Sequence, residues 1–192
     1  MAGLQAAPSV DLDPVRLVDA DGSPTDETRY SRDLPHETLA WLYESMVVAR
    51  DLDTEFINLQ RQGELALYAS CRGQEAAQIG AGHASREQDY LVPTYREHGV
   101  AWCRGVDPVS LFGMFRGVNH GGWDSNENNF HLYTIVIGNQ MLNAVGYAMG
   151  LRLDGVVGTG DVNVDAAVMA FTGDGGTVVI CADITVIRRQ EA

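Results

Sequence analysis

Apolar residues recur at helical spacing over one long segment of the chain, residues 33–62. Six of them keep nearly one face, which Asp53 interrupts: Leu39, Leu42, Met46, Ala49, Phe56 and Leu59. Asp33 and Pro35 are residue types that cap a helix and open its first turn, and Gly63 follows the expected last turn. The pattern predicts a helix over this segment.

Two further segments, 73–82 and 141–150, are rich in alanine and glycine and are predicted to be helical. Glycine inside a helix costs about 1 kcal/mol relative to alanine, so close packing against another backbone is the better reason for its presence. We therefore predict closely packed helices at both places, within the chain or between subunits. Asp107 and Pro108 have the types of an N-cap and a first-turn residue, which predicts a short helix over 109–115.

Short apolar runs separate these helical segments. Residues 165–171 are largely apolar without alternation, which is typical of a strand covered on both faces. Residues 134–137 form an apolar, extended run that leads into the helix at 141–150, and one further strand is predicted within 178–187. The alternation of strands and helices predicts an α/β fold, with a mainly parallel sheet and helices on both faces.

The beginning of the chain differs in composition from the rest. Residues 1–32 mix proline, aspartate, glycine, serine and threonine around one short apolar stretch, and residues 19–24 carry a strong turn signal. We predict an extended N-terminal arm with a small hairpin over 1–32 and one α/β domain over 33–192.

Charge and composition restrict the class of partner. The 192 residues include 13 basic and 26 acidic side chains, a formal net charge of −13, which disfavours binding to nucleic acid or to an anionic membrane surface. No apolar run is long enough to span a bilayer and the first residues lack a signal-peptide pattern, so a cytoplasmic location is expected. The three cysteines are widely spaced and suggest neither a disulfide framework nor a CxxC metal site.

A carboxylate flanked by glycines follows the predicted strand at 165–171, in the motif Gly173-Asp174-Gly175-Gly176. Parallel α/β sheets bind ligands at the carboxyl ends of their strands, and glycine allows the backbone to approach a ligand closely. The motif therefore suits a phosphate together with a divalent cation bound by Asp174. The alternative is an ordinary turn after a strand.

Tyr95 and Arg96 supply the donors that a phosphate needs, because a guanidinium offers a forked set of N–H groups and a phenol adds an O–H. The alternative is a surface helix start whose Arg96 pairs with Glu97 or with solvent. In and after the polar loop at 117–130, His120 and His131 are candidates for proton transfer, or are loop histidines without a special role. Their spacing does not suggest a histidine metal site.

Four motifs occur in a fixed order along the chain. They are Gly73-Gln74-Glu75-Ala76, Tyr95-Arg96-Glu97-His98-Gly99, Ile137-Gly138-Asn139-Gln140 with the small residues at 146–150, and Gly173-Asp174-Gly175. Together they resemble the alpha subunit of the thiamine-diphosphate-dependent decarboxylating component of 2-oxo acid dehydrogenase complexes, over about residues 10–177. Residues 59–63 look closest to the branched-chain enzymes, although the pyruvate enzymes share most of the rest.

This resemblance implies a fold, an activity and partners. The fold would be the thiamine-diphosphate-binding α/β fold. The activity would be that of an oxidoreductase that decarboxylates a branched-chain 2-oxo acid or pyruvate on thiamine diphosphate and transfers the acyl group to a lipoyl domain. The partners would be a beta subunit, in an alpha/beta heterotetramer, and the lipoyl-bearing acyltransferase component.

The resemblance also implies roles for individual residues. Tyr95 and Arg96 would hold the diphosphate, and Mg²⁺ would be bound by Asp174. The remaining implied residues are the backbones of Ile135 and Ile137 against the aminopyrimidine ring, Gly175 and Gly176 in the loop that closes on the diphosphate, and His131 as an active-site histidine.

The sequence departs from the family pattern after Gly175. The family has a helix and then an asparagine that supplies a second metal ligand, whereas here 17 residues follow Gly175 and the helix has no counterpart. We therefore expect a C-terminally truncated chain whose fold is incomplete at its C-terminal side and which alone binds the cofactor weakly or not at all. The alternative is a noncatalytic remnant or interaction module that has lost cofactor binding.

Overall fold

The computed structural model describes residues 15–27, 33–120, 122–173 and 176. The chain divides into two compact units, with the division between residues 39 and 40. In the first unit, Val18 and Pro24 form an antiparallel bridge, and the backbone N–H of Asp19 donates to Ser23 O at 2.8 Å. The turn predicted at 19–24 is therefore present.

Helix α1, His36–Arg61, confirms the long predicted helix. Its fully buried residues are Ser45, Ala49, Asp53 and Phe56, whereas Leu39, expected on the buried face, is 45% exposed. Asp53 interrupts the apolar face because its carboxylate is a buried acceptor. It accepts hydrogen bonds from the Tyr68 hydroxyl, the Ser70 hydroxyl and the backbone N–H of Cys71, each at 2.8 Å. Asp53 thereby joins α1 to the segment that precedes α2.

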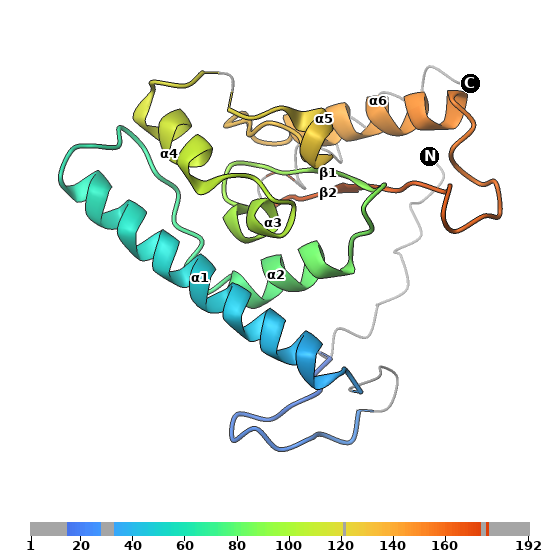
Figure 1. The fold of residues 1–192 in the computed structure, drawn as a ribbon, viewed down its shortest axis with the longest axis horizontal. Coiled ribbons are helices and arrows are strands. Elements are labelled where there is room, and N and C mark those ends of the chain that lie inside the picture. The colour runs from blue at the N-terminus through green and yellow to red at the C-terminus, as the bar shows by residue number, and fades with distance from the viewer. Residues whose placement is uncertain (1–14, 28–32, 121, 174–175, 177–192) are drawn as a thin grey trace, which may run out of the picture. The chain divides into compact units, whose positions relative to one another are not determined.

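Two parallel strands lie in the second unit, β1 over Tyr90–Val92 and β2 over Val168–Ala170, with Tyr90 opposite Val168. Leu91 belongs to a core cluster shared with α1, α3 and α4, and Tyr90 and Val92 pack with Ala144 of α6. Figure 1 shows the two strands side by side at the centre of this unit, with helices on either side of them. The predicted parallel sheet with helices on both faces is confirmed, although β2 is shorter than the apolar run 165–171.

The other helices, with their bounds, are α2 Glu75–Ala84, α3 His98–Cys103, α4 Pro108–Arg116, α5 Ser125–Asn128 and α6 Asn139–Leu153. Helix α4 begins as predicted, because the Asp107 side chain accepts from Val109 N at 3.0 Å and Pro108 occupies the first turn. None of the helices in the described ranges has the length and apolarity needed to cross a bilayer.

Close packing of a small residue is confirmed for α2 at Gly82, whereas Gly80 faces open space. A Cβ added at Gly82 would lie 2.6 Å from Cβ of Cys103, so a larger residue there would push α2 away from α3. In α6 the situation differs, because a Cβ at Gly146 or Gly150 would meet no atom within 4 Å in the described part of the chain. For α6, close packing between subunits stays a prediction.

Helix α2 is also tied to α1 by an ion pair. The Arg50 guanidinium donates to the Glu75 carboxylate, which in addition accepts from the backbone N–H of Gly73 at 2.9 Å. These bonds, with that from Arg50 first, lower the pKa of Glu75 to about 2. The motif Gly73-Gln74-Glu75 thus fixes the start of the helix that lines the site described next.

The apolar run 134–137 differs from the expected extended run. It contains no strand and ends in a turn in which Asn139 N donates to Val136 O at 3.2 Å, and its three isoleucine and valine side chains are 55–67% exposed. The polar loop at 117–130 contains α5. The strand predicted within 178–187 lies outside the described residues.

Candidate functional site

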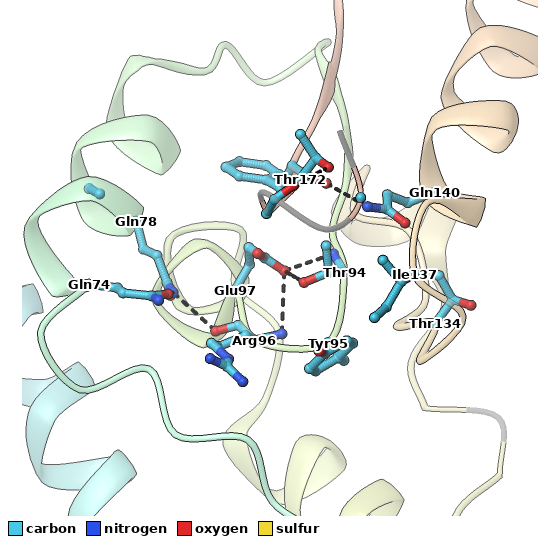
Figure 2. A pocket seen from close by; sticks show the side chains of 14 residues that line it. Gln74, Gln78, Thr94, Tyr95, Arg96, Glu97, Thr134, Ile137, Gln140 and Thr172 are labelled. Carbon is cyan, nitrogen blue, oxygen red and sulfur yellow. Dashed lines mark hydrogen bonds between the residues drawn. The ribbon is translucent and has the colours of Figure 1, made fainter. Parts of the chain in front are cut away.

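A cavity of about 480 Å³ opens in the second unit beside the carboxyl ends of β1 and β2. Its volume lies within the usual range of small-molecule sites, roughly 300–1,000 Å³. Four segments line it: α2 through Gln74, Ala77 and Gln78; the segment after β1 through Thr94, Tyr95, Arg96 and Glu97; the entry to α6 through Thr134, Ile137 and Gln140; and the segment after β2 through Phe171, Thr172, Gly173 and Gly176. Figure 2 shows these side chains converging from separate parts of the chain. The site therefore lies where a parallel sheet is expected to bind a ligand.

Tyr95 and Arg96, predicted as donors, both line this cavity. The guanidinium carbon of Arg96 lies 5.7 Å from the centroid of the Tyr95 ring. Within the described residues, the guanidinium makes no hydrogen bond and no ion pair. An uncompensated cation beside a phenol gives this wall the donors that a phosphate requires.

Glu97 does not pair with the Arg96 side chain, contrary to one of the alternatives. One oxygen of its carboxylate accepts from Thr94 N and from the Thr94 hydroxyl, each at 2.7 Å, and from the backbone N–H of Arg96 at 3.3 Å. These bonds close a tight turn over residues 94–97, as the dashed lines in Figure 2 show. The acidic neighbour therefore folds the backbone and leaves the guanidinium open to a ligand.

A buried aromatic cluster supports the turn from behind. The His98 ring stacks on Tyr68 with the ring centroids 5.1 Å apart. Its Nε2 donates to Ala69 O at 2.8 Å because a carbonyl can only accept, so Nδ1 accepts from the Tyr133 hydroxyl at 3.0 Å. Burial lowers the pKa of His98 to about 4, which keeps this ring neutral near pH 7. His98 is thus a structural histidine directly after the turn.

The entry to α6 forms the opposite wall. Gly138 caps the helix with φ of +88°, a conformation that favours glycine, and places Ile137 at the cavity. Ile135, the other residue predicted to present its backbone, is not among the lining residues and its side chain is 63% exposed. Gln140 donates through Nε2 to Phe171 O at 3.0 Å, which joins α6 to the end of β2.

The cavity wall also carries an open acceptor. Among the described residues, Gln140 Oε1 is the one buried side-chain oxygen or nitrogen without a hydrogen-bond partner. Gly176 is buried so close to the Thr172 hydroxyl that a Cβ would collide with it, which explains the glycine at this position. Asp174 and Gly175, predicted as metal ligand and loop glycine, lie outside the described residues. Within the described ranges, no group of three histidine, cysteine, aspartate or glutamate side chains is arranged to hold a metal.

His131, predicted as a catalytic residue, does not line the cavity. Its Nδ1 lies 3.1 Å from the Tyr90 hydroxyl and its Nε2 lies 3.5 Å from Nδ2 of Asn143. Burial lowers the pKa of this ring, and its catalytic role stays a prediction.

Sequence reasoning missed Gln78, Glu97 and Gln140 as working parts of the site. All three occur inside or beside the recognised motifs, but their partners lie on other elements or in the backbone of the turn. For these three residues the sequence offered one indication, the adjacency of Glu97 to Arg96. It suggested an ion pair between the two side chains, which does not form.

Comparison with known proteins adds evidence of a different kind. The model of a family described as the dehydrogenase E1 component matches residues 43–178. The chain is 54% identical over 170 residues to the 3-methyl-2-oxobutanoate dehydrogenase subunit alpha of Mycobacterium tuberculosis, covering 88% of this chain and 44% of that protein. It is 34% identical over 163 residues to the pyruvate dehydrogenase E1 component subunit alpha of Staphylococcus epidermidis, covering 85% of this chain and 42% of that protein. The chain thus spans less than half the length of these relatives.

Proposed function

Because the chain belongs to the dehydrogenase E1 component family, we propose that its cavity binds thiamine diphosphate and that it acts in the decarboxylation of a branched-chain 2-oxo acid. The observation that carries the proposal is the open guanidinium of Arg96 beside Tyr95 in a cavity of suitable size. The branched-chain substrate class is favoured over pyruvate because identity to the relative named for 3-methyl-2-oxobutanoate is 54%, against 34% for the one named for pyruvate.

The residues present fit the cofactor. Tyr95 and Arg96 would donate to the diphosphate, and the apolar side chain and backbone of Ile137 would contact the aminopyrimidine ring from the opposite wall. Gly176 would allow the segment after β2 to lie close to the diphosphate, and Asp174 is proposed to bind the accompanying Mg²⁺. When bound, thiamine diphosphate supplies the nucleophilic carbon for attack on the substrate carbonyl. The protein side chains orient the cofactor and neutralise the charge of its phosphates.

We also propose roles for this chain that depend on its assembly with partner subunits. The relatives are named alpha subunits, and we propose that this chain likewise associates with a beta subunit in a heterotetramer and delivers the acyl group to a lipoyl-bearing acyltransferase component. His131 is proposed to take part in proton transfer there. Burial lowers the pKa of this ring and so favours the neutral imidazole, the form that can accept a proton.

Calorimetric titration with thiamine diphosphate and excess Mg²⁺ tests the cofactor proposal, with the chain alone and with a co-expressed beta subunit. We expect weak or no binding by the chain alone and saturable binding with the beta subunit, which Arg96→Met weakens at least tenfold, because the replacement keeps the bulk and removes the charge. Arg116→Met is the matched control, since Arg116 pairs with Glu64 and does not line the cavity. Equal affinity of the wild type and Arg96→Met would contradict the proposal, as would absence of binding in both preparations.

A further inference from the structure

Gln78 connects α2 to the backbone of residues 96–99, through Arg96 O at one end and Gly99 N at the other. Its side chain is 5% exposed and its amide uses both of its polar atoms. Nε2 donates to Arg96 O at 3.0 Å and to Gln74 Oε1 at 3.2 Å, and Oε1 accepts from Gly99 N at 2.8 Å. Figure 2 shows this side chain reaching from α2 to the backbone of Arg96.

The fit between Gln78 and its partners is tight. A Cβ added at Gly99 would lie 3.0 Å from Cβ of Gln78 and 3.2 Å from its Oε1, so α2 and the start of α3 are held at a short separation. The glutamine amide offers a donor for Arg96 O and an acceptor for Gly99 N at the same time. Asparagine has these groups on a shorter side chain, glutamate lacks the donor, and methionine lacks both.

These two bonds fix the position of the Arg96 backbone relative to α2. Arg96 O also accepts from His98 N at 2.8 Å, but that bond lies within the turn and does not fix its distance from α2. Gln74 and Ala77 of α2 line the cavity beside Gln78. The Gln78 amide therefore joins the Arg96 backbone to α2, which forms the neighbouring wall of the cavity.

We propose that Gln78 is a positioning residue for diphosphate binding, acting through the backbone of Arg96. This inference rests on the proposed function, because it assumes that Arg96 contacts the cofactor. The new element is that part of the affinity for the diphosphate depends on Gln78, a buried neutral side chain that need not touch the phosphates. Loss of the Gln78 amide should leave the cavity in place and allow the guanidinium to move away from its productive position.

A double-mutant cycle tests the proposal, with thiamine diphosphate and excess Mg²⁺ titrated by calorimetry into the full chain assembled as in the preceding test. We expect Gln78→Met to weaken binding about fivefold, the effect of one or two net hydrogen bonds. If Gln78 acts through Arg96, the variant with both Gln78→Met and Arg96→Met should bind no more weakly than Arg96→Met alone. The exposed Gln62, changed to methionine, is the control and should bind like the wild type.

A second ligand separates positioning from a general loss of structure. The affinity for thiamine monophosphate should fall less than that for thiamine diphosphate in Gln78→Met, whereas partial unfolding would reduce both equally. If Gln78→Met does not fold, Gln78→Glu replaces it, because glutamate keeps an acceptor for Gly99 N, loses the donor to Arg96 O and Gln74 Oε1, and places a negative charge at the cavity wall, so that Gln78→Asn, which keeps the amide, is measured beside it. The same fivefold loss is then expected.

The failures of the two proposals are distinguishable. Weakened binding by Arg96→Met together with wild-type affinity in the Gln78 variants would overturn the positioning role alone, as would effects of the two replacements that multiply in the double variant. Wild-type affinity in Arg96→Met would overturn the proposed function and the positioning role with it.

Discussion

Lowering the pH from about 7.5 to about 5 is expected to destabilise the folded chain through His98. This imidazole is buried against Tyr68 and Tyr133, and the charges of Asp53 and Arg96 also act on its pKa. Burial is the largest cause of its lowered pKa, about 4 against an ordinary value of 6.5. Protonation is therefore harder in the folded state than in the unfolded state, and the unfolded state takes up the proton first as the pH falls.

The magnitude follows from the two pKa values. The contribution of His98 to the free energy of unfolding is present above pH 6.5 and is lost progressively as the pH falls toward 4. At about pH 5 the unfolded imidazole is almost fully protonated and the folded one is mostly neutral, which corresponds to a loss of about 2 kcal/mol. This is a large fraction of the stability of a typical domain.

Urea denaturation followed by far-ultraviolet circular dichroism at the two pH values measures this loss. His98→Gln keeps a donor and an acceptor on the side chain and cannot titrate, so its stability should change much less between the two pH values. A smaller change will persist in this variant, because burial also lowers the pKa of His131. His36→Gln, with an exposed side chain at the start of α1, should retain the wild-type pH dependence. An undiminished pH dependence in His98→Gln would refute the reasoning.

Two further predictions concern packing and buried hydrogen bonds, and urea denaturation measures both. Gly82→Ala should cost about 1–3 kcal/mol because its Cβ would lie 2.6 Å from Cβ of Cys103, whereas Gly80→Ala, with open space, should be neutral or stabilise by up to about 1 kcal/mol. Equal effects would contradict the packing argument. Asp53→Leu should lower the free energy of unfolding by about 3 kcal/mol or more, because the buried donors Tyr68 OH and Cys71 N would lose their acceptor. Asp51→Leu, at an exposed position, should lower it by about 0.5 kcal/mol or less. A loss under about 1 kcal/mol at Asp53 would count against a stabilising network.

Local signals in the sequence were sufficient for α1 and α4, whereas α3 and α5 were not predicted. The cap at Asp107 with Pro108, and the apolar periodicity over 36–61, depend on residues a few positions apart, and both are confirmed. The interruption of that periodicity by Asp53 could not be interpreted in the same way. Its hydrogen-bond partners lie 15 to 18 residues further along the chain, where no helical spacing connects them.

The apolar run at 134–137 shows the limit of hydrophobic pattern as a guide. Four residues of strand-like composition turn into α6 instead of joining the sheet, and Ile135 and Ile137 are more than half exposed. Thr134 alone bonds to the segment after β1, through its backbone N–H to Thr94 O at 3.0 Å. A run of β-branched residues predicts an extended or buried segment only when a neighbouring strand edge or a covering face is available.

Only part of the site could be predicted from the sequence. Tyr95 and Arg96 could be chosen because their side-chain chemistry suits a phosphate, and they do line the cavity. Gln78 could not be chosen by chemistry, since a glutamine in a helix has no preferred ligand. Its importance arises only when the fold brings Arg96 O and Gly99 N within reach of one amide.

The turn at 94–97 resolves an electrostatic difficulty that the composition creates. A chain with a net charge of −13 repels a diphosphate at long range, and a glutamate directly after the arginine would ordinarily neutralise it. Here the Glu97 carboxylate is occupied by two backbone N–H groups and one hydroxyl of its own turn, so its charge is compensated without the Arg96 side chain. Among the described residues, the guanidinium is thereby left as a free cation at the cavity wall. The same three bonds fix the backbone to which Gln78 is joined from α2, so anion affinity and loop geometry depend on one small set of hydrogen bonds.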